Sequence, residues 1–251
     1  MAQDGTRGFV PSADGFAFAN AWPAAPAVTV PLPGGSVGIG NAARGLCGGM
    51  VFAALDYWHA GVAAPAGQPA AGTPLYRFIV RRLIDSWHLP AGVARYYRWM
   101  LQPDGDVGRA GVAARTVSRE WPAIRASIDG GAPAALGVVT VASASPLLLG
   151  GNHQVLAYGY SLAGTEVTLR VYDPNVGPDD GVWIRFDTAS KPAGGASPAG
   201  AASPAGSFAH NLGLRLPVRG FFLTRYAPAR PPAAFTGCQT RGRRAAGTPS
   251  G

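Results

Sequence analysis

The sequence has little cysteine, almost no lysine and no long uninterrupted hydrophobic run. Two cysteines, Cys47 and Cys238, exclude the disulfide framework that holds many small secreted proteins together. The apolar stretch ALGVVTVASASPLLLG contains serines and is shorter than the roughly 20 residues that span a bilayer. No basic stretch followed by an apolar run opens the chain, so no signal peptide is predicted. We therefore expect a soluble protein without a membrane partner. It is cytoplasmic by default, with secretion by a non-classical route left open.

Acidic residues are also few, with 13 against 21 basic residues and a net charge of +8. All the basic residues except Lys191 are arginines, and they are scattered along the chain. No aromatic–basic stripe or zinc-finger spacing accompanies them, so we expect no nucleic-acid partner. No Cys-x-x-Cys or His-x-x-x-His pair occurs either, and the sequence predicts no metal and no cofactor.

Composition divides the chain into one domain with flexible additions. Residues 1–40 are rich in glycine and proline and predict an extended N-terminal arm over the surface. Residues 41–226 carry enough apolar material for a single core. The segment Ala-Ser-Pro-Ala-Gly occurs twice in the region 189–206, which predicts a disordered insertion within the domain. The composition of 230–251 predicts a disordered tail, and the oligomeric state stays open.

Hydrophobic periodicity predicts helices first and strands afterwards. Helical patterns cover 47–61, a stretch starting at Thr73-Pro74, 93–101 and 118–131. After residue 131 the segments APAALGVVTV, HQVLAYGYSLAGTEVTLRVYDP, GVWIRFD and RGFFLTRY are typical of strands. Segregated helices and a mostly antiparallel sheet indicate the α+β class.

The segment RGLCGGMVFAALDYW places Cys47 at the start of the first predicted helix. Unpaired amides and the positive end of the helix dipole would favour a thiolate there. Gly45, Gly48 and Gly49 remove side chains around the cysteine, so we expect them to let a substrate backbone approach. A cysteine that only fills the core as a small apolar residue is the alternative reading.

The expected residue pairing in a β-hairpin predicts a base for such a nucleophile. The strands HQVLAYGY and TEVTLRVYD flank SLAG, so opposed residues should sum to about 326, which puts His153 opposite Asp173. A carboxylate at that position would orient the imidazole. Asn175 is the alternative orienting residue, although Pro174 is expected to end the strand before it. Gln154 is expected to point to the opposite face and to be structural.

An oxyanion would need donors besides the Cys47 amide, and Asn41, six residues earlier, carries a side-chain amide. With Asn152-His153 opening a strand and Tyr172-Asp173-Pro174-Asn175 closing the next, these residues resemble papain-like cysteine peptidases. The greatest similarity is to the bacteriocin-leader-peptidase-like subgroup, which has Cys, His and Asp in this order. The family usually has Gln where this chain has Asn41.

The resemblance covers about residues 38–60 and 130–226. It implies an N-terminal helical lobe, with the nucleophile helix packed on a C-terminal antiparallel sheet and the active site between them. It also implies Cys47 as nucleophile, His153 as general base and acid, and Asp173 as the orienting residue. The expected function is a peptidase or amidase that acts on a peptide or protein substrate through an acyl-enzyme. An acyltransferase of transglutaminase type and a non-catalytic papain-like binding domain are the alternatives.

Overall fold

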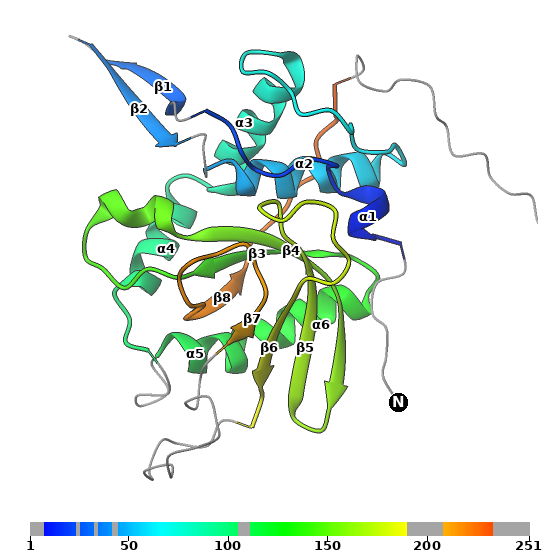
Figure 1. Ribbon diagram of the computed structural model, residues 1–251. Helices are drawn as coiled ribbons and strands as arrows, with labels where there is room; N and C mark the ends of the chain where they lie inside the picture. Colours follow the sequence, from blue (N-terminus) through cyan, green and yellow to red (C-terminus); the bar gives the residue numbers. More distant parts are fainter. Residues whose placement is uncertain are drawn as a thin grey trace, which may run out of the picture.

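A computed structural model describes residues 8–23, 45–104, 111–189 and 208–232, together with the backbone of 26–32 and 35–41. Figure 1 shows helices and an antiparallel sheet, and the α+β class is confirmed. The helical elements of the described chain are α1 (Pro11–Asp14), α2 (Cys47–His59), α3 (Pro74–Ser86), α4 (Ala91–Met100), α5 (Val112–Arg115), the π-helical segment η2 (Thr116–Glu120) and α6 (Trp121–Asp129).

Local signals place these helices where the sequence predicts them. Helix α2 begins at Cys47, and Thr73 caps α3 by accepting a hydrogen bond from the Tyr76 amide at 3.4 Å. The helix predicted over 118–131 starts earlier, because α5, η2 and α6 run on continuously from Val112.

Six strands form one sheet in which every neighbouring pair is antiparallel. Their order is β7-β6-β5-β4-β3-β8. The strands are β3 (Ala134–Val139), β4 (His153–Ala163), β5 (Glu166–Tyr172), β6 (Trp183–Asp187), β7 (Ala209–His210) and β8 (Gly220–Leu223), and the 3₁₀ turn η3 (Pro146–Gly151) precedes β4. A separate hairpin pairs β1 (Pro26–Leu32) with β2 (Gly35–Asn41).

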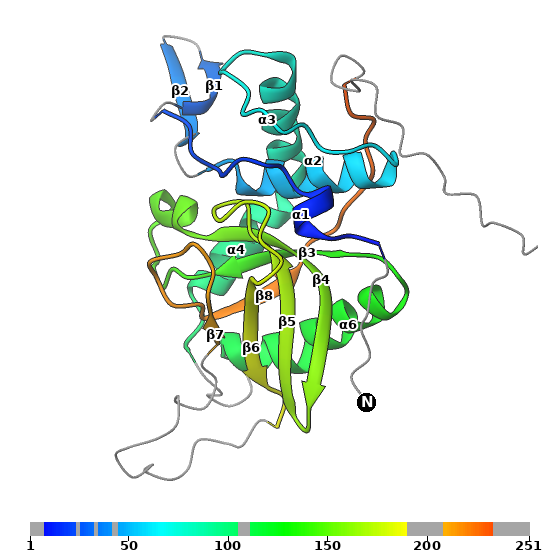
Figure 2. The same cartoon turned by 45° about the vertical axis from the view of Figure 1, so that its right-hand side comes forward.

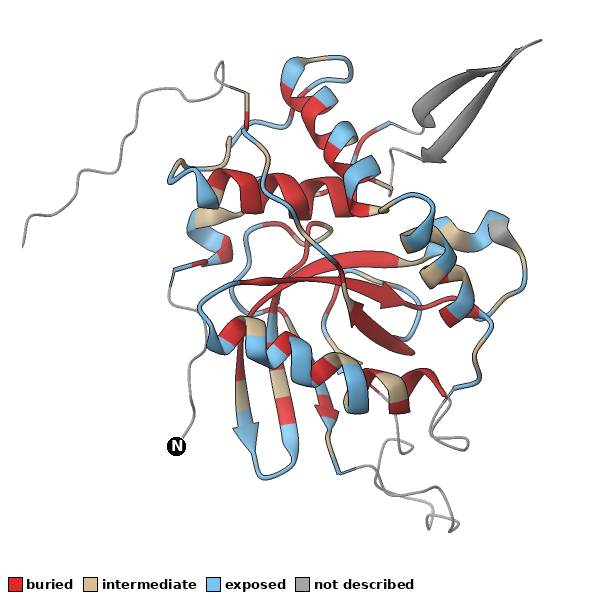
Figure 3. Cartoon of the chain, turned by 180° about the vertical axis from the view of Figure 1, so that it is seen from behind, coloured by how far each residue is buried: buried red, intermediate tan, exposed pale blue. Residues whose placement is uncertain are grey.

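Apolar side chains cover both faces of this sheet. One cluster joins α2 and α3 to Leu156 and Tyr158 of β4, and a second joins α6 to Val155 and Ala157 of the same strand. Figures 2 and 3 show α2 and α6 on opposite sides of the sheet, with most of α2 buried. Alternate residues of a strand point to opposite faces, so β4 contributes to both clusters.

The N-terminal segment is not an arm over the surface. Phe9, Phe16 and Trp22 are buried in the cluster around α2, and the ring of Phe16 packs edge-on against Tyr57 with centroids 6.0 Å apart. Segment 8–23 includes α1, and β1 and β2 follow it. The expectation of an extended arm over residues 1–40 is therefore corrected for this part. Glycine and proline dominate the local composition, but a few aromatic residues are enough to anchor a segment in a core.

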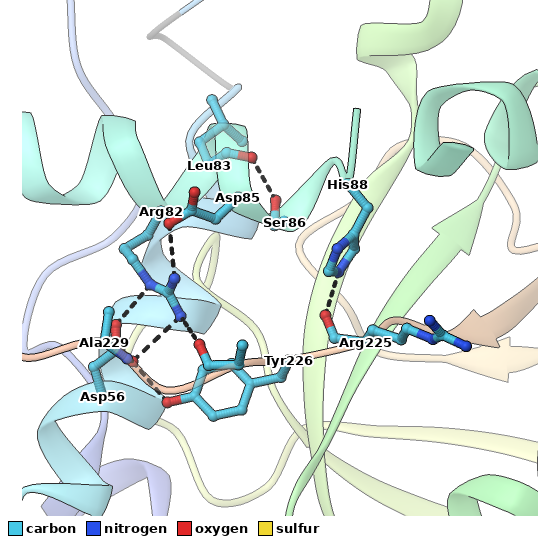
Figure 4. Close-up of polar contacts among 10 residues, drawn as sticks. Asp56, Arg82, Leu83, Asp85, Ser86, His88, Arg225, Tyr226 and Ala229 are labelled. Atoms are coloured by element: carbon cyan, nitrogen blue, oxygen red, sulfur yellow. Dashed lines mark hydrogen bonds and ion pairs between the residues drawn. The ribbon is translucent and has the colours of Figure 1, made fainter. Parts of the chain in front are cut away.

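The chain after β8 crosses α2 and α3, and we call residues 224–232 the C-terminal strap (Figure 4). The hydroxyl of Tyr226 donates to Asp56 Oδ1 at 2.7 Å, and the amide of Ala229 donates to the same oxygen at 2.8 Å. Arg82 pairs with Asp56 at 2.7 Å and donates to the carbonyl of Ala227 at 2.8 Å. The strap thus closes a buried polar cluster between the two helices.

Burial raises the pKa of the Asp56 carboxyl, while the contacts from Tyr226, Ala229 and Arg82 oppose that rise. A buried carboxylate of this kind depends on all of its partners, because each lost partner leaves charge uncompensated. His88 also bonds the Arg225 carbonyl.

The described residues do not include 190–207 and 233–251. These two ranges hold most of the predicted insertion and of the predicted tail, as well as Cys238.

Candidate active site

Cys47 is the first residue of α2, and its side chain is buried, with 6% of the residue exposed. Leu46 is the N-cap residue and makes no side-chain cap. The first helical hydrogen bond runs from the Met50 amide to the Leu46 carbonyl at 2.9 Å. The amide of Cys47 therefore belongs to the first turn, whose amides have no carbonyl to bond within the helix.

The structure brings His153 and Asp173 together and places Cys47 beside them. His153 Nε2 lies 2.7 Å from Asp173 Oδ1, and both residues are buried. Cys47 adjoins the same imidazole, whose pKa its charge raises. Because Nε2 faces the carboxylate, Nδ1 is the ring nitrogen left for the sulfur. The structure thus brings the three predicted side chains together, and their catalytic roles stay predictions.

The hairpin of β4 and β5, which brings His153 and Asp173 together, has its turn later in the sequence than predicted. Ala163 pairs with Glu166 across a two-residue turn, so the opposed residues do not sum to the predicted value. Continued without interruption, this register would put Asp173 opposite Leu156. A carboxylate there would lie on the other face from His153, because a shift of one residue reverses the face.

A β-bulge directly after Ala157 restores the correct face. Beyond the bulge Ala157 pairs with Val171. Continued along both strands, this register places Asp173 opposite Val155. Val155 is two residues from His153, and residues two apart on a strand share a face. The prediction of direct opposition is wrong, whereas the prediction that the two side chains meet is confirmed.

Backbone amides hold the Asp173 carboxylate from its other side. The amide of Asn175 donates to Oδ1 and that of Gly213 to Oδ2, each at 2.8 Å. The side chain of Asn175 instead bonds Asn20 at 3.0 Å and the Gly213 carbonyl at 3.3 Å. Its role as an alternative orienting side chain for His153 is therefore corrected: Asn175 positions the carboxylate through its backbone.

The charges of the three groups are coupled. Burial lowers the pKa of His153, but the charges of Asp173 and Cys47 and the hydrogen bonds to them outweigh burial and raise this pKa to about 10. Burial raises the pKa of Asp173, whereas His153 and the two backbone amides lower it more, so the carboxyl pKa lies below its usual value. Each of the two groups thus stabilises the charged form of the other.

Tyr96 of α4 belongs to the site, although no motif marked it in the sequence. Its hydroxyl donates to the His153 carbonyl at 3.1 Å. Burial raises the pKa of Tyr96 well above its usual value, and the charge of Cys47 adds to this rise. The side chain therefore lies within electrostatic range of the sulfur. Helical periodicity could only identify Tyr96 as an apolar-face residue, because its partner is 57 positions away.

The glycines after Cys47 make room for protein rather than for substrate. A Cβ atom on Gly48 would lie 2.7 Å from the Gln154 side-chain carbonyl carbon and would also meet the Ser86 hydroxyl. A Cβ atom on Gly49 would meet the backbone of Ile79 in α3. The expectation that these two glycines clear space for a substrate is wrong: they let α2 pack closely on α3 and β4.

The side-chain amide of Gln154 donates to Ser86 Oγ at 3.2 Å, and its expected structural role stays a prediction. Asn41 is the last residue of β2, and its side chain lies outside the described residues, so its oxyanion role stays a prediction. Within the described ranges no group of three or more His, Cys, Asp or Glu side chains could hold a metal ion. None of the helices described there combines the length and the apolar character needed to cross a membrane.

Comparisons of the chain with protein-family models, with curated proteins and with solved structures give no significant match.

Proposed function

We propose that the protein is a thiol-dependent hydrolase that cleaves peptide or isopeptide amides in a peptide or protein substrate. The observation that carries the proposal is the position of His153, which bonds the buried Asp173 carboxylate and adjoins Cys47 at the start of α2. An imidazole beside a thiol can act as its base, and first-turn amides can donate to a developing oxyanion. These features agree with what the resemblance to papain-like peptidases implies.

In the proposed reaction the Cys47 sulfur attacks the carbonyl carbon of the scissile amide, and the carbonyl electrons move to oxygen. The intermediate collapses when the C–N bond breaks and His153 gives its proton to the leaving amine, which leaves a thioester on Cys47. His153 then takes a proton from water, and the resulting hydroxide attacks the thioester. The acid product leaves, and the thiolate and the imidazolium are restored.

Each of the other site residues has a part in this scheme. Asp173 keeps Nδ1 of His153 directed at the sulfur and stabilises the imidazolium. The Cys47 amide would donate to the oxyanion, with the predicted Asn41 side chain as a second donor. Tyr96 holds the backbone of His153 from the side of α4. Because it bonds the backbone carbonyl, we assign it a positioning role.

Alkylation rates test the nucleophile directly. We expect iodoacetamide to label Cys47 faster than Cys238 in the same molecule at pH 6, as peptide mapping by mass spectrometry would show. The His153→Ala and Asp173→Asn variants should slow labelling of Cys47 about tenfold or more, because they remove the charge partner or its anchor. Labelling of Cys238 serves as the internal control, and Cys47→Ala should lose only the fast phase.

Equal rates at the two cysteines would contradict the proposal. That result would favour the non-catalytic binding domain, a reading that the low exposure of Cys47 also supports. A thioester substrate supplied with a primary amine distinguishes hydrolysis from acyl transfer. Release of the acid supports the hydrolase, whereas an amide product supports the transglutaminase-like alternative.

A further inference from the structure

The described residues of α4, α5 and η2 line an open pocket of about 360 Å³. This volume lies at the lower end of the range for small-molecule sites. None of Cys47, His153 and Asp173 is in its wall. Its wall includes Arg95, Arg98, Trp99, Arg115, Arg119 and Glu120. We call this the arginine cavity.

Two helical segments bring these arginines to one place. Arg95 and Arg98 are three residues apart on α4, and Arg115 and Arg119 are four apart along α5 and η2. Residues with these spacings lie on one face of a helix. The wall therefore forms where the arginine faces of the two segments meet. Segment η2 is π-helical, and short π-helical segments occur frequently at functional sites.

One arginine of the wall is held rigidly. Arg95 donates to Glu120 Oε1 at 2.6 Å and to the Leu223 carbonyl at 2.8 Å, and its guanidinium lies 4.3 Å from the centroid of Phe222. The other carboxylate oxygen of Glu120 accepts from the Leu223 amide at 2.9 Å. The carboxylate of Glu120 thus positions Arg95 in the wall.

The wall brings four guanidinium groups and one carboxylate around a small volume. Because Arg95 is paired with Glu120, the exposed side chains of Arg98 and Arg119 are the ones that we expect an anion with several charges to engage. The planar fork of arginine matches the oxygens of phosphate, which it binds in pairs. Trp99 adds a flat apolar wall beside these groups. A pocket of this volume with a cationic lining is suited to a small ligand.

We propose that the arginine cavity binds a small phosphorylated molecule with at least two negative charges. This inference is independent of the proposed hydrolase function, since the two sites share no residue. It gives a role to arginines that sequence analysis could describe only as scattered basic residues.

Calorimetric titration of the full chain with inorganic pyrophosphate and with adenosine diphosphate, at constant ionic strength, tests the proposal. We expect saturable binding of at least one probe. The Arg98→Gln/Arg119→Gln double variant, which changes two exposed side chains of the wall, should weaken it about tenfold or more. Arg77→Gln/Arg185→Gln removes the same charge from exposed positions outside the wall and should change affinity less than about twofold. Melting temperatures of both variants check that they are folded.

Several results would overturn the proposal. Failure of both probes to bind the wild type excludes the site, and an oligothymidylate that binds in that case points to a nucleic-acid surface instead. An equal loss of affinity in the two double variants shows that only bulk charge matters. Citrate that binds as tightly as pyrophosphate shows that the site does not select phosphate.

Discussion

An alanine at position 49 tests how closely α2 and α3 approach each other. The added Cβ atom would lie 3.0 Å from the carbonyl carbon of Ile79 and 3.1 Å from its Cγ2, and nearer still to the carbonyl oxygen. Unstrained contacts between carbon atoms are about 3.5–4.0 Å long. The main obstacle is backbone, so no change of side-chain rotamer relieves it. The two helices must move apart locally.

Two opposing effects set the expected change in stability. Alanine is favoured over glycine inside a helix by roughly 1 kcal/mol. Overpacking a well-packed core costs about 1–3 kcal/mol, and a clash with backbone belongs at the upper end of that range. The net loss in free energy of unfolding is therefore about 2 kcal/mol. For a protein of this size that corresponds to a fall of about 4–8 °C in melting temperature.

Urea and thermal unfolding followed by tryptophan fluorescence would measure this change. Gly67→Ala is the matched control, because nothing lies within 4 Å of the Cβ atom it would add, and its stability should stay close to that of the wild type. A Gly49→Ala protein as stable as the wild type would refute the close helix contact. If that stable variant also showed slow alkylation of Cys47, the glycine would instead serve substrate access.

Two further predictions concern buried polar groups. Because the pKa of His153 is raised to about 10 in the folded protein, its stabilising contribution is complete below about pH 6.5 and is lost as pH rises through about 10. The wild type and His153→Gln should therefore differ less in free energy of unfolding at pH 10 than at pH 7, by a few kcal/mol in order of magnitude. A difference that stays constant with pH would contradict the raised pKa of His153. Tyr226→Phe removes a donor to the buried Asp56 carboxylate and should lower stability by about 2 kcal/mol in urea unfolding without changing the alkylation rate of Cys47. An unchanged unfolding midpoint would show that the C-terminal strap does not depend on this bond.

Local sequence signals predicted much of the fold. The periodicity after Cys47 and the capping residue Thr73 identified α2 and α3, and the switch to strand patterns after residue 131 identified the sheet. These features depend on neighbours within a few positions. The prediction of a surface arm was wrong for residues 8–23, because whether Phe16 is buried depends on Tyr57, far along the chain.

The sequence by itself determined which chemical groups are available and on which elements they lie: a cysteine at a helix start, a histidine opening a strand and an aspartate closing the next. Only the tertiary structure decided how they meet. The bulge after Ala157, which no residue pattern marked, sets the face of the sheet on which Asp173 lies relative to His153. The contact of Tyr96 with this site and the meeting of two arginine faces likewise depend on the packing of helices distant in sequence. Such contacts are set by the shape of the whole core, which no local window of residues contains.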